Sequence, residues 1–258
     1  MSRRLNALLL LPSLAVLCAV AISCGSSGQA QVRFVHAIQD GAAMDIDITG
    51  PTDVVPTPVF SAISFLQVLP SQPGYTGVAS GADKIEGFLT GTTNVGFNGV
   101  PINLSGSQAY TLVATGLVSP SKNAVILPIA DNIPSPEISD VAFRVINASP
   151  SGPNGTGGAV DVYVLLNPAS GPRGTPTFSG VAYQQATGYV GTPFNPNNDT
   201  TPPGFTVFVV PAGQSAPPYI VSEGINPSTG GAVRTIVLTD VQNGNAMSPR
   251  FLELSDLN

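Results

Sequence analysis

One segment of this chain occurs twice, in the same order and with closely similar residues. The first copy reads Arg-Phe-Val-His-Ala over residues 33–37 and Ala-Met-Asp-Ile-Asp-Ile over residues 43–48. The second copy reads Arg-Val-Ile-Asn-Ala over residues 144–148 and Ala-Val-Asp-Val-Tyr-Val over residues 159–164. A Thr-Pro-x-Phe-Ser motif follows in both copies. The repeat predicts two related domains laid end to end, in which shared residues serve the fold and residues of one copy only are candidates for a specific function.

The residue pattern of both copies predicts β-structure. Short runs rich in Val, Ile, Thr, Phe and Tyr alternate with turn residues, and the 28 glycines and 25 prolines argue against long helices. Seven short strands are expected in each unit of roughly 100 residues. The predicted fold is therefore all-β, with two tandem immunoglobulin-like β-sandwich domains at residues 31–131 and 141–258. A Pro-rich linker at residues 132–140 is expected to join them.

The N-terminus predicts export from the cytoplasm. Arg3 and Arg4 precede an apolar run, so residues 1–23 are expected to be a signal peptide of the general secretory route. The run ends in Ala-Ile-Ser-Cys, which resembles the lipobox of bacterial lipoproteins and makes Cys24 the predicted lipidated residue, followed by a tether over residues 24–30. Plain secretion and an uncleaved membrane anchor are the alternatives. The predicted location is the cell envelope, with the chain lipid-anchored at the outer membrane or cell surface.

The charge and the cysteine content of the chain limit which partners and which covalent bonds can be expected. The chain has nine basic and fifteen acidic residues and a formal net charge of -6, and no basic patch is visible. Nucleic acid is therefore excluded as an expected partner, because binding phosphates needs such a patch. The two cysteines are Cys18 and Cys24, so cleavage before Cys24 leaves no pair for an internal disulfide.

The start of each copy resembles an uncharacterised bacterial family of secreted or lipid-anchored β domains. Copies of that family open with a strand ending in His-Ala-Ser-Pro-Asp, followed by a Val-Asp-Val-Tyr strand. The first copy here keeps His36 and Asp40 of this opening, whereas the second keeps Ala-Ser-Pro at residues 148–150 and has Asn147 in place of the histidine. The resemblance implies tandem β domains outside the cytoplasm and implies no known reaction.

No catalytic residue and no cofactor are predicted. His36 is the single histidine of the chain, and its counterpart in the second copy is Asn147. A position that accepts either residue is expected to donate and accept hydrogen bonds at a turn, not to transfer protons. Arg33 with Asp45, and Arg144 with Asp161, are expected to form cross-strand ion pairs within each copy.

Three carboxylates form a candidate metal site. Asp45 and Asp47 alternate with apolar residues, so both side chains lie on one face of a strand. With Asp40 nearby they are candidate calcium ligands, because calcium prefers oxygen. The alternative is a solvated strand face, and the second copy offers Asp161 with Tyr163 in place of Asp47.

Aromatic residues in the longer loops of the second copy are candidates for ligand binding. Tyr189, Phe194 and Tyr219 are expected either to stack on sugar rings or a partner protein, or to cover the ends of the sandwich. The predicted function is thus a non-enzymatic binding, adhesion or scaffold module of the cell envelope, with the membrane as one partner and an envelope protein or glycan as another. A carbohydrate-binding accessory protein is the alternative, and an enzyme is the least favoured reading.

Overall fold

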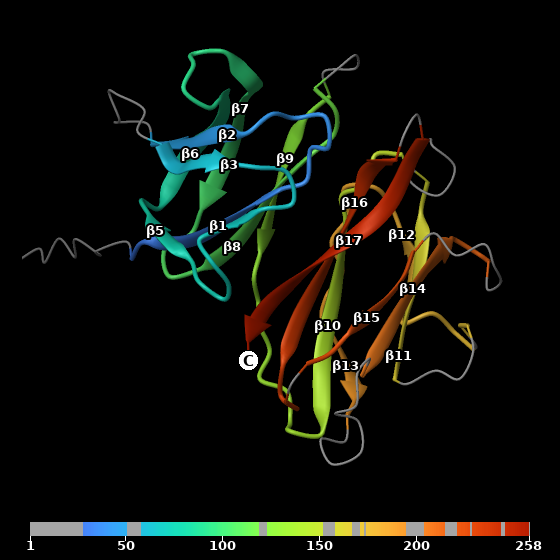
Figure 1. Cartoon of the computed structure of the whole chain (residues 1–258). Coiled ribbons are helices and arrows are strands. Elements are labelled where there is room, and N and C mark those ends of the chain that lie inside the picture. The colour runs from blue at the N-terminus through green and yellow to red at the C-terminus, as the bar shows by residue number, and fades with distance from the viewer. Residues whose placement is uncertain are drawn as a thin grey trace, which may run out of the picture.

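All regular secondary structure in the described part of the chain is β-strand, in agreement with the predicted all-β fold (Figure 1). The computed structural model describes residues 28–50, 58–118, 123–151, 158–166, 171–172, 174–194, 204–214, 221–227, 229–243 and 246–257. These residues contain no helix long and apolar enough to cross a membrane. The predicted signal peptide and Cys24 lie outside these ranges.

The first nine strands form one sandwich, here called domain 1. They are β1 (Ala30–His36), β2 (Met44–Thr49), β3 (Pro58–Ile63), β4 (Val68–Leu69), β5 (Thr76–Val78), β6 (Gly81–Leu89), β7 (Val95–Leu104), β8 (Ala109–Thr115) and β9 (Val125–Ala130). One sheet has the order β4-β1-β8-β9, with β5 also paired to β1, and the other has the order β3-β2-β6-β7.

The remaining eight strands form domain 2 by the same plan. They are β10 (Asp140–Asn147), β11 (Val160–Leu166), β12 (Phe178–Val181), β13 (Val190–Pro193), β14 (Phe205–Pro211), β15 (Val221–Ile225), β16 (Val233–Asn243) and β17 (Ala246–Leu257). One sheet has the order β13-β10-β16-β17 and the other β12-β11-β14-β15. Both domains pair their first strand in parallel with a later one, β1 with β8 and β10 with β16, while their other pairings are antiparallel. The repeat in sequence is therefore a repeat in topology.

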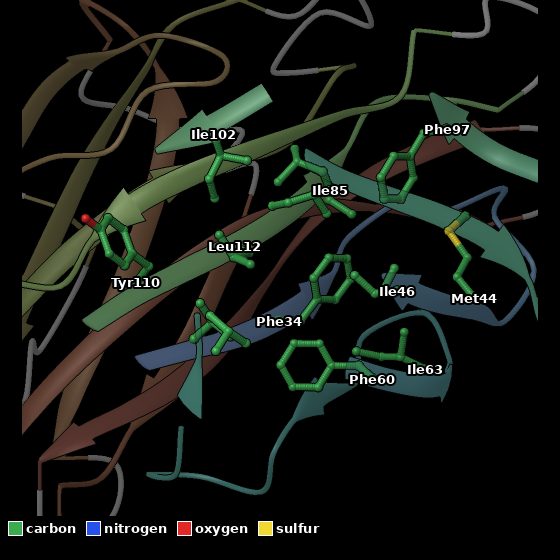
Figure 2. Packing of buried hydrophobic residues seen from close by; sticks show 14 of the residues in the cluster. Phe34, Met44, Ile46, Phe60, Ile63, Ile85, Phe97, Ile102, Tyr110 and Leu112 are labelled. Carbon is green, nitrogen blue, oxygen red and sulfur yellow. The ribbon is translucent and has the colours of Figure 1, made fainter. Parts of the chain in front are cut away.

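Each sandwich encloses its own apolar core. In domain 1, Phe34 of β1 lies 6.0 Å from Phe60 of β3, ring centre to ring centre, with Ile46, Ile85 and Leu112 packed around them (Figure 2). The core of domain 2 has Phe205 at its centre, within 5.0 Å of the Phe143 ring and 5.9 Å of the Phe194 ring. Burial of such side chains contributes about 1.5–3 kcal/mol each, so these two cores supply most of the driving force for folding.

The sheets that contain β1 and β10 are covered on both faces, and we call them the inner sheets. Along β1, Val32 and Phe34 point into the core of domain 1, whereas Arg33 and Val35 point the other way. A third apolar cluster lies on that second face and joins the two domains. Its buried members are Val35, Ala37, Val113, Ile146, Ala148, Val237 and Leu254. The molecule is thus a stack of four sheets, and the inner strands read as nearly continuous apolar runs because neither face meets water.

The structure contains three short edge strands that the sequence pattern did not predict. We expected seven strands in each unit, and β4, β5 and β13 were not among them. They comprise two, three and four residues, and they hydrogen-bond to the edges of β1 and β10. Segments this short carry no detectable alternation, and Pro70 and Pro73 between β4 and β5 gave the stretch the composition of a loop.

A β-bulge occurs at the same place in both domains. In β3 the extra residue falls at Ala62, which has φ of 51°, and in β12 it falls at Gly180, with φ of 62°. The carboxylate of Asp45 accepts a hydrogen bond from the backbone N–H of Ala62 at 2.7 Å, and Asp161 accepts one from Gly180 at 2.6 Å. The aspartate of the Val-Asp-Val motif therefore holds the bulge of the neighbouring strand.

The bulge yields a test of the duplicated geometry. Alanine at positive φ costs about 1–2 kcal/mol, and glycine gives back part of that through its freer unfolded chain. We expect Ala62→Gly to raise the free energy of unfolding by roughly 0.5–1 kcal/mol and Gly180→Ala to lower it by a similar amount. Nothing lies within 4 Å of a Cβ built at Gly180, so that loss would come from the backbone alone. Urea unfolding of the two variants measures both effects, and a loss of stability in Ala62→Gly would contradict the interpretation.

Candidate functional site

Eight polar side chains, four from each domain, meet between the inner sheets, and we call this group the joint. Domain 1 contributes Arg33 from β1, Thr111 from β8, Tyr75 just before β5 and Asp131 just after β9. Domain 2 contributes their counterparts, which are Arg144 from β10, Thr235 from β16, Tyr189 just before β13 and Asp256 from β17. The two arginines, two threonines and two aspartates are all buried.

Within each domain the four residues form one hydrogen-bonded chain. In domain 1, Nε of Arg33 donates to Oγ1 of Thr111 at 2.8 Å, and that hydroxyl donates to Oδ2 of Asp131 at 2.6 Å. The hydroxyl of Tyr75 donates to the same Oδ2 at 2.9 Å. The threonine is therefore a bridge between a cation and an anion of its own domain.

Domain 2 repeats these contacts atom for atom. Nε of Arg144 donates to Oγ1 of Thr235 at 2.6 Å, and that hydroxyl donates to Oδ2 of Asp256 at 2.5 Å. The hydroxyl of Tyr189 donates to the same oxygen at 3.0 Å. The two chains are related by the pseudo-symmetry of the duplication.

The direct ion pairs run across the joint. Nη2 of Arg33 donates to Oδ1 of Asp256 in domain 2, and Nη2 of Arg144 donates to Oδ1 of Asp131 in domain 1. Each domain thus provides the counter-ion of the other. Arg33 also lies 3.8 Å from Oδ2 of Asp131 in its own domain, but the shorter ion pair of each arginine is made with the other domain. Because a buried charge is costly without its partner, these crossing pairs couple the two domains.

Aromatic rings complete the surroundings of both cations. The Arg33 guanidinium lies over the Tyr75 ring, 5.1 Å from its centre, and the Arg144 guanidinium lies 4.8 Å from the centre of the Tyr189 ring. No described atom accepts a hydrogen bond from Nη1 of Arg33. The face of the Tyr75 ring is therefore a further contact of the Arg33 guanidinium.

Burial and neighbouring charges shift the pKa values of Arg33, Tyr75 and Tyr189. Burial by itself lowers the pKa of Arg33, but the carboxylates of Asp256 and Asp131 more than offset this, so its pKa is raised. Burial raises the pKa of Tyr75 and of Tyr189, so both hydroxyls remain protonated donors at neutral pH. Arg33, Tyr75 and Tyr189 therefore keep their protons at neutral pH.

Backbone contacts reinforce the joint at its far end. The hydroxyl of Thr115 in domain 1 donates to the carbonyl of Ala148 at 2.6 Å, and the hydroxyl of Thr239 in domain 2 donates to the carbonyl of Ala37 at 3.0 Å. Gln72 adds a further crossing contact, since its Oε1 accepts from the N–H of Ser255 at 2.5 Å. Hydrogen bonds between the two domains thus extend along the inner strands, from the joint to Thr115 and Thr239.

The predicted pairs of Arg33 with Asp45 and of Arg144 with Asp161 are wrong. Both arginines point away from their own core toward the opposite domain, whereas both aspartates lie on strands of the outer sheets. Asp45 instead accepts N–H donors from Ala62 at 2.7 Å and Gly91 at 3.2 Å. Asp161 accepts the equivalent donors from Gly180 and Gly213, at 2.6 and 2.7 Å.

Two of the three predicted calcium ligands, Asp45 and Asp47, line one pocket, but Asp40 is not among its described lining residues. Both Asp45 oxygens are occupied by donors, and Asp40 accepts an N–H from Val118 at 2.8 Å. Asp47 is buried and its Oδ1 has no described hydrogen-bond partner; burial, Glu86 and Asp45 raise its pKa. Among the described residues, no three His, Cys, Asp or Glu side chains form a group that could hold a metal ion.

The candidate ligand-binding aromatics divide into three cases. Phe194 is buried in the core of domain 2, which contradicts the expectation of an exposed ring and fits the alternative of a residue that closes the sandwich. Tyr189 belongs to the joint, with its ring under Arg144 and its hydroxyl on Asp256. Tyr219 lies outside the described residues.

His36 has the predicted structural role. Its Nδ1 accepts the N–H of Ile38 at 3.3 Å, and its Nε2 lies 3.2 Å from the carbonyl of Ala42. Asn147 does the same in domain 2, where Oδ1 accepts the N–H of Ser149 at 3.2 Å and Nδ2 donates to the carbonyl of Val181 at 3.0 Å. The two residues are therefore interchangeable hydrogen-bonding elements of a turn.

A repeated set of polar residues could have revealed the joint. Arg33, Thr111 and Asp131 each have a counterpart of identical type in the second copy, inside segments that are otherwise apolar. A buried charge kept in both copies is expected to have a partner. The pattern does not say that the partner belongs to the other copy.

A cavity of about 440 Å³ lies outside the joint, beside β7. The residues that line it are apolar or glycine, namely Val95, Gly96, Phe97, Gly99, Val100, Val118 and Ala124. Its described lining residues therefore offer no nucleophile, acid or base.

The fold and the joint define a tandem β-sandwich protein whose domains are locked by exchanged charges. Residues 27–154 match the model of the family described as Domain of unknown function (DUF4397), a match that covers domain 1 and continues through β10. This match agrees with the predicted resemblance to an uncharacterised domain family.

Other comparisons add little. No curated protein matches the chain. One solved structure, described as "Alpha-glucan binding by a streptococcal virulence factor", is 12% identical and covers 81% of this chain and 92% of that chain, with a TM-score of 0.24. A similarity this low carries no argument about fold or function.

The joint predicts a large cost for removing one charge. Asp131→Asn leaves Arg144 buried without its anion, and breaking a buried pair in this way costs about 3–5 kcal/mol. We expect urea unfolding of this variant to show that loss and to separate into two transitions, one for each domain. Glu86→Gln is the control, because Glu86 pairs at 2.9 Å with Lys84, whose side chain is 51% exposed, and should cost less than about 1 kcal/mol. Equal small losses in both variants would contradict a coupling role for the joint.

We expect His36 to make the free energy of unfolding depend on pH, whereas Asn147, its counterpart in domain 2, does not titrate. Burial lowers the pKa of His36 in the folded state, whereas an unfolded histidine titrates near pH 6.5. Below about pH 6.5 the unfolded state therefore binds the proton more readily, and stability falls as the pH falls. We expect His36→Asn to fold and to show a weaker loss of unfolding free energy between pH 7 and pH 5.5. An unchanged pH slope in this variant would show that His36 is not the cause.

Proposed function

We propose that this chain is a non-enzymatic lipoprotein of the bacterial cell envelope, in which two sandwiches act as one body that binds, adheres to or scaffolds an envelope partner. The observation that carries the proposal is the joint. Its buried residues have no opening to a substrate and exchange their charges between domains, which is the construction expected of a spacer or scaffold.

The sequence supports an anchored location. A lipobox ending in Cys24 follows an apolar run, and the two β-sandwich domains follow the short tether. Two or more acyl chains on a cysteine give firm membrane attachment, whereas one gives only marginal attachment. The function proposed here therefore needs lipidation, not only export.

Carbohydrate binding by the loops of domain 2 ranks behind this proposal. Of the three rings that suggested it, Phe194 is part of the core and Tyr189 is held under Arg144. Phe194 is buried, and one face of the Tyr189 ring is covered by the Arg144 guanidinium. A binding surface of that kind would have to be built without them.

Metabolic labelling tests the anchor. Full-length protein expressed in a Gram-negative host with a clickable palmitate analogue should be labelled, and Cys24→Ala should not. Cys18→Ala is the matched control, because Cys18 lies in the segment expected to be removed, and it should keep the label. Protease treatment of intact cells then distinguishes a surface-exposed body from one facing the periplasm. Absence of label on the parent protein would overturn the proposal.

A further inference from the structure

The chain is bound to the body of domain 1 almost immediately after the predicted lipidation site. The N–H of Ser107 donates to the carbonyl of Gln29 at 3.0 Å, and the N–H of Gln31 donates to the carbonyl of Gln108 at 2.9 Å. A Cβ built at Gly106 would lie 2.3 Å from the carbonyl oxygen of Gly28, so only glycine permits this approach. Residues from Gly28 onward are therefore held against the turn between β7 and β8.

The length of free chain sets a limit on distance. Three residues separate Cys24 from Gly28, and an extended chain spans at most about 3.6 Å per residue. The two Cα atoms are thus within roughly 14 Å of each other. A cysteine whose acyl chains lie in a bilayer is held at the headgroup layer, so Gly28 lies close to that layer too.

The surface around Gly28 has the composition of a face that can approach lipid. We call this surface the proximal face and define it as Gly28, Gln29, Gly77 and residues 105–108, which are Ser, Gly, Ser and Gln. Gly77 belongs to it because a Cβ there would lie 2.5 Å from the Gln29 side chain. None of these residues carries a charge, although the chain as a whole has a formal charge of -6. An uncharged face avoids the repulsion that an acidic surface meets at anionic lipid.

The proximal face is also free of the second domain. Gly28, Gln29 and residues 105–107 are exposed. In Figure 1, β1 begins at the left edge of domain 1, whereas domain 2 occupies the right side of the view. Nothing in the described structure covers this end of the sandwich.

We propose that domain 1 rests on the lipid headgroup layer through the proximal face, with the turn between β7 and β8 directed at the membrane. This inference depends on the lipidation of Cys24 proposed above. It assigns one end of one domain to the membrane and leaves the opposite end, at the turn between β6 and β7, facing away.

Two single-cysteine variants test the orientation. Ser105→Cys places a thiol on the proximal face, and Thr93→Cys places one beyond the other end of β7, a strand of ten residues that is about 33 Å long. Both positions are exposed turn residues, and after processing the introduced cysteine is the single free thiol. Lipidated protein is labelled with a fluorophore and reconstituted in phosphatidylcholine vesicles that contain a headgroup nitroxide lipid. We expect several-fold stronger quenching at position 105 than at position 93.

Controls separate this inference from the anchor itself. Flotation with the vesicles reports attachment, and protein that does not float overturns the proposed lipoprotein together with its orientation. Protein that floats but shows equal quenching at both positions, or stronger quenching at position 93, overturns the orientation alone. Insertion of twenty Gly and Ser residues after Ser26 should keep flotation and abolish the quenching difference. A difference that survives the insertion would show that the short tether does not orient the domain.

Discussion

The exchange of buried ion pairs between the two domains is the constraint on which the rest of this structure depends. Arg33 makes its shortest ion pair with Asp256, and Arg144 makes its shortest ion pair with Asp131, so each arginine loses that partner when the other domain is removed. Replacing such a pair by apolar residues is often neutral, but breaking it is costly. The crossing pairs therefore favour the one arrangement of the two sheets in which both carboxylates meet both arginines.

Because the domain is duplicated, each contact in one domain can be compared with the equivalent contact in the other. Asp45 and Asp161 hold equivalent bulges, and His36 and Asn147 make equivalent turn contacts with different chemistry. Because the histidine position works with an amide, proton transfer is not what this position is required to do. The same comparison shows that residues of the repeated motif make equivalent structural contacts in both domains.

Alternation of apolar residues was enough to predict the sandwich architecture, because one face of each outer sheet meets water and the other meets a core. It was not enough for the joint. The pattern around Arg33 tells which face the side chain occupies, but it does not tell which sheet lies opposite, so a pair with Asp45 looked as reasonable as one with Asp256. Phe194 failed as an exposed ring for a related reason, since a loop position says nothing about whether the core beneath has room for an aromatic side chain.

Coupling between the domains has a mechanical consequence for an anchored protein. A flexible linker would let domain 2 sample many positions around domain 1, whereas Thr115 to Ala148 and Thr239 to Ala37 hold the inner sheets together at one end, and the joint holds them farther along the same strands. In the lipoprotein proposed above, the orientation of domain 1 at the headgroups would determine where domain 2 is presented. Loss of one ion pair would then do more than lower the free energy of unfolding, because it would also release domain 2 from a fixed position relative to domain 1.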